Sequence, residues 1–212
     1  MPRPRLDHDE QRERIARAAC EVILEIGLEN ARLSEIATHA GVTTGAVQHY
    51  FRNKEDLLFF AKNHVFDIAM KRTGDAMENQ EGAERLFTII RKYLPVSGEQ
   101  VKAARLLETF RGRAVGNANM LRAQHKRDAR FLEMLVQEIG LLKEKGLTRT
   151  DLDVGASALG LNAMLDGLGA IVMASPGSFK AMDLFGIVEN YVCEAMGLAR
   201  PRQEQPARKK QA

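Results

Sequence analysis

Tryptophan is absent from this chain of 212 residues, and aromatic residues make up only 6% of it. Proline and cysteine are also scarce, with six and two residues. No stretch alternates apolar and polar residues as a half-buried strand does. These absences argue against a sheet, and the frequent Ala, Leu, Glu and Arg favour helices. The sequence therefore predicts an all-α protein.

The two cysteines, Cys20 and Cys193, lie far apart in the sequence. They form no CxxC or Cys/His metal-binding spacing, so no metal site is expected. Residues 1–14 carry charges where a signal peptide needs an apolar run, which predicts no export. Two cysteines without such a signal indicate reduced, buried thiols in a cytoplasmic protein.

The chain lacks both a strongly basic half and an uninterrupted apolar run. Residues 1–62 contain nine Lys and Arg and ten Asp and Glu, so their charges nearly cancel. The whole chain carries a net charge of only +3. Contact with phosphates would therefore depend on local placement of side chains, not on a basic field. Asn162 and Asp166 break the apolar segment 158–174. That segment suits a buried helix better than a membrane span.

Apolar residues recur at helical spacing along most of the chain, and glycine or proline separates the runs. We expect about nine helices, at 10–27, 33–40, 44–51, 53–77, 84–94, 99–115, 120–145, 151–174 and 178–196. The fourth is long enough to leave one domain and enter another. The expected division is a three-helix domain at 8–68, a larger helical domain at 69–198 and a basic tail at 199–212. The tail is expected to be disordered, as a solubilising segment or a loose attraction to DNA.

The segment Ser34–Phe51, SEIATHAGVTTGAVQHYF, has the pattern of two short helices joined by a tight turn. Gly41 supplies a residue that tolerates positive φ in the turn. Ala37 lets the second helix cross the first closely, and Val42 and Val47 would hold the pair together. This spacing predicts a helix-turn-helix.

The second helix of this motif carries small or hydrogen-bonding residues where a core helix would carry charges. Thr43 is placed to cap it. Gln48 can bond adenine through N6 and N7, and Thr44 can donate to phosphate and contact a thymine methyl. Gly45 lets the backbone approach the duplex. Further side chains placed to hold phosphates are His49, Tyr50 and Lys54.

The stretch IATHAGVTTGAVQHYFRNKEDLL, residues 36–58, resembles the signature of the TetR-type transcriptional regulators. The resemblance covers about residues 10–65, and the length and helix count of the remainder are similar to that family's ligand-binding and dimerisation domain. LDGLGA at 165–170 is similar to the choline-responsive betaine-operon repressors. The resemblance implies a homodimeric repressor that binds a near-palindromic double-stranded operator and is released by a small-molecule effector.

Two positions depart from the pattern of this family. Arg32 stands where a threonine is common, so either Asn30 caps the second helix or Arg32 itself reaches a phosphate. Gln48 stands where an aromatic residue is common, so base contact there should differ from that of typical members. Near the N-terminus, Arg3 and Arg5 either reach a minor groove as an arm does or belong to a frayed end.

The resemblance also implies an effector pocket among the fifth to eighth helices. Apolar side chains at helical spacing either line this pocket or are ordinary core residues. The candidates are Phe66, Met70, Phe87, Ile90, Leu106, Phe110 and Met134. Asn162 and Asp166 join them, because they lie four apart on the most apolar helix, where an unpaired carboxylate would be costly. These two either bond across a dimer interface, which we favour, or contact a ligand.

Choline itself is disfavoured as the effector. The chain has no Trp and only three tyrosines, Tyr50, Tyr93 and Tyr191. This scarcity argues against an aromatic cage for a quaternary ammonium group.

The same resemblance implies that the last two helices pair with those of a second copy in a four-helix bundle. Candidate interface residues are Leu161, Leu165, Leu168, Val188 and Val192. Two recognition helices would then meet successive major grooves, roughly 34–36 Å apart. We expect the protein to repress transcription, not to activate it.

Two other classes of protein compete with a regulator. An enzyme is disfavoured because the five histidines form no HExxH, and GASAL at 155–159 has Leu159 where a nucleophile elbow needs glycine. GLGAIV at 167–172 also departs from the dinucleotide fingerprint. A helical adaptor would leave the polar face of Thr44–Tyr50 unexplained. The sequence thus predicts a DNA-binding regulator without catalytic residues or cofactor.

Overall fold

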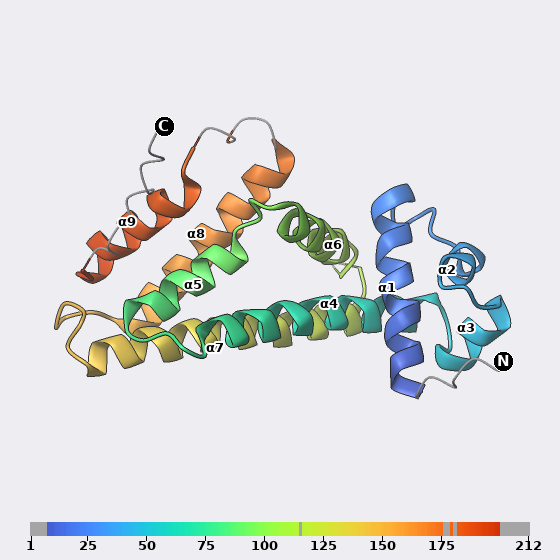
Figure 1. Cartoon of the computed structure of the whole chain (residues 1–212), viewed down its shortest axis with the longest axis horizontal. Coiled ribbons are helices and arrows are strands. Elements are labelled where there is room, and N and C mark those ends of the chain that lie inside the picture. Colours follow the sequence, from blue (N-terminus) through green and yellow to red (C-terminus); the bar gives the residue numbers. More distant parts are fainter. Residues whose placement is uncertain (1–7, 115, 176–178, 180–181, 200–212) are drawn as a thin grey trace, which may run out of the picture.

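In the computed structural model the described residues, 8–114, 116–175, 179 and 182–199, contain helices and no strand. Nine helices follow one another in this part of the chain (Figure 1): α1 His8–Ile26, α2 Leu33–His39, α3 Thr44–Tyr50, α4 Lys54–Met77, α5 Ala83–Tyr93, α6 Gly98–Ala114, α7 Ala118–Glu144, α8 Val154–Ala174 and α9 Leu184–Met196. The all-α prediction is confirmed. Arg3, Arg5 and tail residues 200–212 lie outside the described residues.

Helices begin where a side chain satisfies the first free backbone N–H groups. The Asn53 side chain accepts from the Asp56 N–H at the start of α4 (2.8 Å). At α8, the Asp153 carboxylate accepts from the Ala156 N–H (2.9 Å). This cap starts α8 at Val154, so the predicted start at residue 151 is wrong. The predicted start of the last helix at 178 is wrong for the same reason, since Asp183 caps α9.

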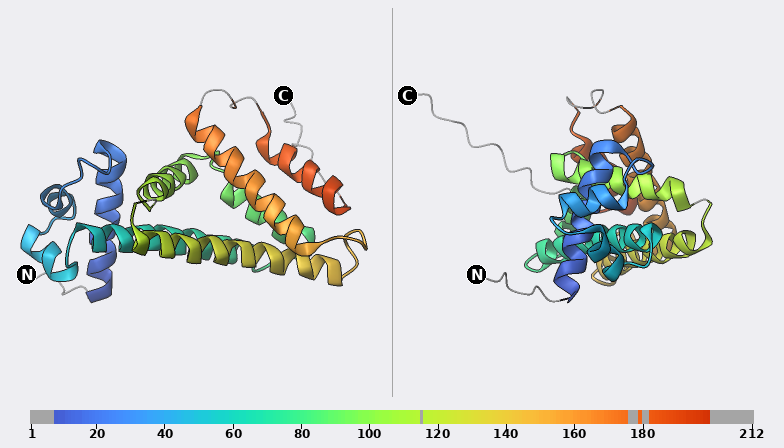
Figure 2. Two further views of the ribbon diagram at one scale, coloured as in Figure 1. Left: turned by 180° about the vertical axis from the view of Figure 1, so that it is seen from behind. Right: turned by 90° about the vertical axis from the view of Figure 1, so that its right-hand side faces the viewer.

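The helices are arranged in two groups joined by the longest elements. Helices α1, α2 and α3 gather at one end of the molecule, and α4 and α7 run along its length away from them (Figures 1 and 2). Helix α5 packs on α4, α7 and α9, while α8 packs on α6, α7 and α9. Helix α6 contacts α1, α4, α7 and α8, so it touches both groups.

Two hydrophobic cores correspond to these groups. The first is formed by α1, α2, α3 and the start of α4, together with Leu106, Phe110 and Ala114 of α6 and Met120 of α7. The second is formed by α5, α7, α8 and α9 and the end of α4. The predicted boundary at residue 68 falls within α4, between the two cores. One face of α6 nevertheless belongs to the N-terminal core.

Helix α8 is, among the described helices, the one long and apolar enough by length and composition to cross a membrane. Its Ala158, Leu161 and Leu165 are buried against the rest of the chain. Asn162 and Asp166 lie on the same helix. Apolar residues facing a packed core, with polar residues on a neighbouring face, are the pattern of a core helix.

Candidate functional site

Helices α2 and α3 form the predicted helix-turn-helix. Gly41 in the turn between them has φ 63°, the left-handed region that favours glycine. The Val42 N–H donates to the Ala37 carbonyl (2.9 Å), which closes the turn. Ile36, Ala37 and Val47 are buried where the helices cross. The motif is therefore held by its own backbone and by small apolar contacts.

The start of α2 settles which residue caps it. The Arg32 N–H donates to the Glu35 carboxylate (2.8 Å), so Glu35 satisfies the backbone group at this end. Asn30 instead donates to the Ile26 carbonyl (2.9 Å) at the end of α1. The alternative in which Asn30 caps α2 is wrong. The Arg32 side chain is exposed, and its contact with a phosphate stays a prediction.

The α3 helix presents most of the predicted DNA-contact residues to solvent. Thr44, Gly45, Gln48 and His49 are exposed. The Thr43 hydroxyl accepts from the Ala46 N–H (3.1 Å), as expected of a cap. The exposed backbone, amide and imidazole groups suit contact with a polar partner.

Two of the predicted phosphate contacts are partly engaged within the chain. The Tyr50 ring packs between His8 and His49, with ring centroids 5.0 and 5.2 Å away. The Lys54 ammonium donates to the Leu28 carbonyl (3.0 Å), which ties the start of α4 to the end of α1. An ammonium has three protons, so this bond leaves two for a phosphate. The role of Lys54 on DNA stays a prediction.

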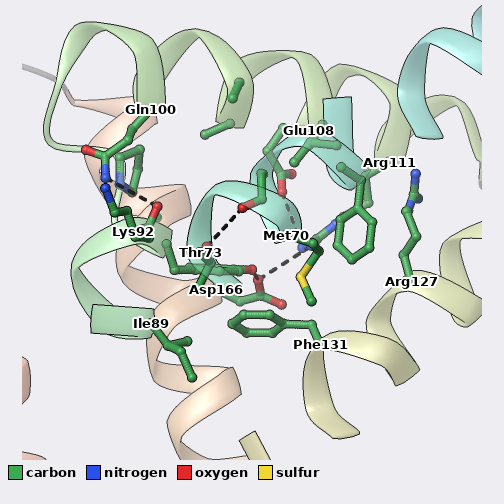
Figure 3. Close-up of a pocket in the computed structure, with 18 of the residues that line it drawn as sticks. Met70, Thr73, Ile89, Lys92, Gln100, Glu108, Arg111, Arg127, Phe131 and Asp166 are labelled. Carbon is green, nitrogen blue, oxygen red and sulfur yellow. Dashed lines mark hydrogen bonds and ion pairs between the residues drawn. The ribbon is translucent and has the colours of Figure 1, made fainter. Parts of the chain in front are cut away.

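A cavity of about 390 Å³ lies among α4, α5, α6, α7 and α8 (Figure 3). Phe66, Met70, Ile89, Leu107 and Phe131 supply part of its apolar wall. Several charged side chains share the wall and come from all five helices: Arg72, Lys92, Glu99, Glu108, Arg111, Arg127, Asp128 and Asp166. A cavity of this size, whose wall combines apolar side chains with polar groups that can orient a ligand, suits a small molecule.

Only part of the predicted pocket lines this cavity. Phe66, Met70, Asn162 and Asp166 do. The structure places the other candidates in the hydrophobic cores or beside them, so their assignment to the cavity wall is wrong: Phe87, Ile90, Leu106, Phe110 and Met134.

The reason lies in which face of each helix meets the cavity. On α5, Ile89 and Tyr93 face it, while their neighbours fill the second core. On α6, Leu107 and Arg111 face it, one position after Leu106 and Phe110. Apolar periodicity marks buried positions but does not separate a core face from a cavity wall.

Asp166 faces the cavity and is bound within its own chain. The Tyr93 hydroxyl donates to the Asp166 carboxylate, and Arg111 Nη2 lies 3.5 Å from the same oxygen. Figure 3 shows this carboxylate between Arg111 and Phe131. Burial, followed by the charge of Asp166, raises the pKa of Tyr93 well above its usual value, so the hydroxyl stays a donor. These contacts place Asp166 at the cavity wall, and the favoured placement at a dimer interface stays a prediction.

Tyr93 and Arg111 are site residues that the sequence reasoning missed. Neither belongs to a motif, and α5 and α6 reach α8 only in the folded chain. The cost of an unpaired carboxylate in an apolar helix did signal that Asp166 needed partners. It did not identify them.

The predicted dimer residues fill the core of a single chain. Leu161, Leu165, Val188 and Val192 are at most 3% exposed, and Leu168 packs partly buried on the same core. The four buried residues have no surface left for a second copy, so their assignment to an interface is wrong, whereas the assignment of Leu168 stays a prediction. The exposed apolar residues of the last two helices are others, namely Leu159, Ile171, Ile187 and Tyr191.

Two family models match the chain. Residues 15–59 match the bacterial regulatory proteins of the tetR family, and residues 82–196 match the C-terminal domain of the BetI-type transcriptional repressors. The HTH-type transcriptional regulator PksA of Bacillus subtilis is 32% identical over 177 residues, covering 83% of this chain and 84% of PksA. The regulator BetI of Proteus mirabilis is 27% identical over 198 residues, covering 91% and 95% of the two chains.

Solved structures agree with these matches. A transcriptional regulator from Rhodococcus sp. Rha1 is 26% identical with a TM-score of 0.75, over 89% of this chain and 98% of the other. A regulator from Saccharomonospora viridis, solved in complex with choline, has the same fold at 22% identity and a TM-score of 0.81, over 89% and 98%. The chain belongs to the tetR family of bacterial regulatory proteins and is a helix-turn-helix transcriptional regulator of the BetI-type repressor class.

Proposed function

We propose that the protein acts in the cytoplasm as a homodimer, binds a near-palindromic operator through α3, and leaves it when a small molecule enters the cavity. The observation that carries this proposal is the position of α6. One face of α6 lines the cavity with Leu107 and Arg111, and the other packs Leu106 and Phe110 into the N-terminal core. We assign binding rather than catalysis to the cavity.

The exposed side of α3 is the proposed reading surface. Gln48 offers an amide that pairs with adenine in the major groove, and Thr44 and Gly45 let the backbone approach the duplex. Arg32 at the start of α2 and Lys54 at the start of α4 are the proposed phosphate contacts. The amide would specify sequence, and the cations would supply affinity.

An exposed apolar stripe on α8 and α9 is the proposed dimer surface. Leu159, Ala163, Gly167 and Ile171 follow one another at spacing of four along α8, and all are exposed. On α9, exposed positions at the same spacing are Ile187, Tyr191 and Ala195. Residues four apart lie on one face of a helix, so each row forms an exposed face of its helix, and α8 and α9 pack on each other. Faces of this kind suit an isologous pairing of α8 and α9 with those of a second copy.

The contacts of α6 give the coupling a physical route. A molecule that moves the cavity face of α6 also moves Leu106 and Phe110 against α1. Packed interfaces resist continuous deformation, so a small shift at α6 changes how the N-terminal helices sit on α4. A coupling of about 1–3 kcal/mol between effector and DNA changes affinity by 5–150-fold.

Choline suits this cavity poorly. The aromatic rings that line the cavity belong to Phe66, Tyr93 and Phe131. Tyr93 and Phe131 stack on each other with centroids 4.5 Å apart, and the Phe66 ring already faces the guanidinium groups of Arg127 and Arg130. A quaternary ammonium needs ring faces that are open to it. We infer that the effector of this chain is a different molecule.

The proposal is tested on the DNA that flanks the gene. Footprinting with the purified protein should protect two half-sites with centres about one helical turn apart and related by two-fold symmetry. Sedimentation of the free protein should give a dimer. A stable monomer, or protection of a single half-site, would contradict the homodimeric mechanism.

A further inference from the structure

Two buried cations beside the cavity are only partly satisfied by the chain. Lys62 of α4 is 1% exposed, and its ammonium has no hydrogen-bond partner among the residues that the structure describes. Arg127 of α7 is 5% exposed; its Nη2 donates to the Gln124 side chain, but its Nη1 has no partner within the described ranges. Among the described residues, no carboxylate oxygen lies within 4.0 Å of either group. Burying a charge without a counter-ion is costly, so this pair needs an explanation.

Arg127 lies in the cavity wall, and Lys62 lies behind the wall, close enough to Arg127, Arg111 and Asp128 for their charges to act on it. Arg127 forms part of the wall, and its guanidinium lies over the Phe66 ring, 5.8 Å from the centroid. Lys62 precedes Phe66 by one turn of α4, on the same face. Figure 3 shows Arg127 rising from α7 on the same side of the cavity as Arg111. Burial, and then the charge of Arg127, lower the pKa of Lys62 to about 8. The positive charges of the two side chains therefore repel each other.

The acidic groups of the cavity are engaged elsewhere. Asp166 and Glu108 pair with Arg111, at 3.5 and 3.3 Å. Asp128 is exposed and accepts a hydrogen bond from the Gln124 amide (2.7 Å). Gln124 thus links Arg127 to Asp128 without an ion pair between them. The positive charge of Lys62 and Arg127 remains without a direct counter-ion in the part of the chain that the structure describes.

We propose that the effector is a small amphiphilic organic anion whose acid group binds Arg127 and Lys62. Its apolar body would lie against Phe66, Met70 and Phe131, which also line the cavity. A carboxylate or a phosphate monoester has several charged acceptors and can take bonds from a guanidinium and an ammonium together. The inference rests on the proposed function, since it names the class of the effector.

Binding at this position would act on the helix that leads to DNA. Lys62 follows Leu58 and Ala61, which belong to the N-terminal core, while Arg127 belongs to α7. An acid group held by both side chains would draw α4 towards α7. The start of α4 and the helix-turn-helix packed on it would follow.

The class of effector can be tested with four probes that share one alkyl chain. Octanoate and octyl phosphate carry an acid group, 1-octanol is neutral and octylammonium is a cation. Thermal unfolding of the full chain is followed by circular dichroism in each. We expect one or both anions to raise Tm by roughly 3–6 °C at ten times the dissociation constant. The neutral and cationic probes should have much smaller effects.

The two anions distinguish a carboxylate effector from a phosphate effector, since the preferred head group should bind at least tenfold more tightly. No shift with either anion up to about 10 mM would overturn the proposal, because a millimolar ligand is already at the weak limit of specific binding. An equal shift with octylammonium or 1-octanol would also overturn it. It would mean that the apolar wall alone binds the probes.

Variants locate the acid group. Lys62→Met and Arg127→Met should each reduce affinity for the preferred anion at least tenfold. Lys71→Met on α4 and Lys126→Met on α7 remove exposed cations from the same helices and should leave that affinity unchanged. Full anion binding in both Lys62→Met and Arg127→Met would overturn the proposed site. If Arg127→Met does not fold, Arg127→Lys and Lys62→Met carry the test.

Operator binding by the parent chain is measured separately, without the probes. A parent that binds its operator and ignores the anions would defeat only the inference about the effector. A parent that binds an anion through Lys62 and Arg127 but protects no DNA would defeat the proposed function instead.

Discussion

Gln48 is the one exposed amide on the outer face of α3, and its neighbours Thr44 and Gly45 carry no bulk that would hold the helix away from a base pair. Gln48→Ala should therefore cost about 1–3 kcal/mol on the operator and relax the preference at one base pair. Arg32→Ala is the control: it should weaken specific and random DNA alike and reduce the salt slope by about one. Competition assays with single-base operator variants measure both. Identical behaviour of the two variants would show the assigned roles to be wrong.

Asp166 has its partners in its own chain, so its removal should act within one protomer. Asp166→Ala leaves the Tyr93 hydroxyl and the Arg111 guanidinium without their shared acceptor. The free energy of unfolding should fall by about 1–3 kcal/mol. Because these contacts lie within one chain, the loss should be the same at two protein concentrations tenfold apart. A loss that grows on dilution would instead place Asp166 at the dimer interface.

Lys62 should make the unliganded protein less stable than an apolar residue would. Its pKa is lowered to about 8 in the folded chain, through burial and the charges of Arg127 and Arg111, with Asp128 opposing them. Below pH 8 the folded chain keeps an unfavourable charge, and between pH 8 and about 10.5 the unfolded chain binds more protons. Lys62→Met should therefore gain about 1–3 kcal/mol at pH 7, and the gain should shrink as the pH rises to 10.

Denaturant unfolding of Lys62→Met and the parent at pH 7, 8.5 and 10 measures this difference. Lys71→Met, an exposed lysine of the same helix, should change stability by less than about 0.5 kcal/mol at every pH. Destabilisation of Lys62→Met at pH 7 would mean that the ammonium is a structural group with a favourable partner.

At the scale of the element, local signals predicted the helix-turn-helix well. Its turn depends on Gly41, its cap on Thr43 and its packing on Ala37 and Val47, all within eighteen residues of sequence. Such features are readable because cause and effect are neighbours in the chain. The start of α8 was misplaced because several polar residues precede it, and only the folded backbone selects Asp153 as the cap.

The faces of the later helices could not be predicted in the same way. On α6, adjacent residues belong to different environments, Leu106 to the N-terminal core and Leu107 to the cavity wall. On α8, Leu161 and Leu165 face the core, and Leu159 and Ile171 face solvent. Periodicity shows that a helix has apolar faces, but which face meets a core, a ligand or a second copy depends on long-range packing.

Helix α6 allows these two roles to be separated by adjacent substitutions. Leu106→Ala removes a 4% exposed side chain from the core shared with α1 and should cost about 2–5 kcal/mol. Leu107→Ala enlarges an existing cavity whose wall is already partly exposed, so it should cost less than about 1.5 kcal/mol. Denaturant unfolding of both variants gives the comparison. Equal losses would show that α6 does not divide its faces between the core and the cavity.

At the scale of the whole molecule, the unpartnered face lies on α8 and α9. The exposed apolar residues there, Leu159, Ile171, Ile187 and Tyr191, range from 45% to 59% exposed. Obligate interfaces usually bury upwards of about 2,000 Å² and are mostly apolar. A two-fold pairing through this face would also leave α1, α2 and α3 free at the far end of each protomer (Figure 1).

The dimer surface is tested by a charge placed on each of its two helices. Ile171→Glu and Tyr191→Glu should each convert a dimer into a folded monomer or a weakly associating one, because an unpaired carboxylate in an apolar interface costs several kcal/mol. Leu141→Glu on α7 is the matched control, since Leu141 is 46% exposed outside this face. Sedimentation velocity at micromolar concentration should show a dimer for the parent and for Leu141→Glu.

The same variants connect assembly to DNA binding. A monomer presents one α3, so Ile171→Glu and Tyr191→Glu should lose the two-fold footprint and bind a single half-site far more weakly, whereas Leu141→Glu should protect both halves. Circular dichroism checks that the helix content of each variant is unchanged. If both α8 and α9 variants remain dimers with the parent's footprint, the second copy is seated elsewhere. The exposed stripe would then be excluded as the dimer surface.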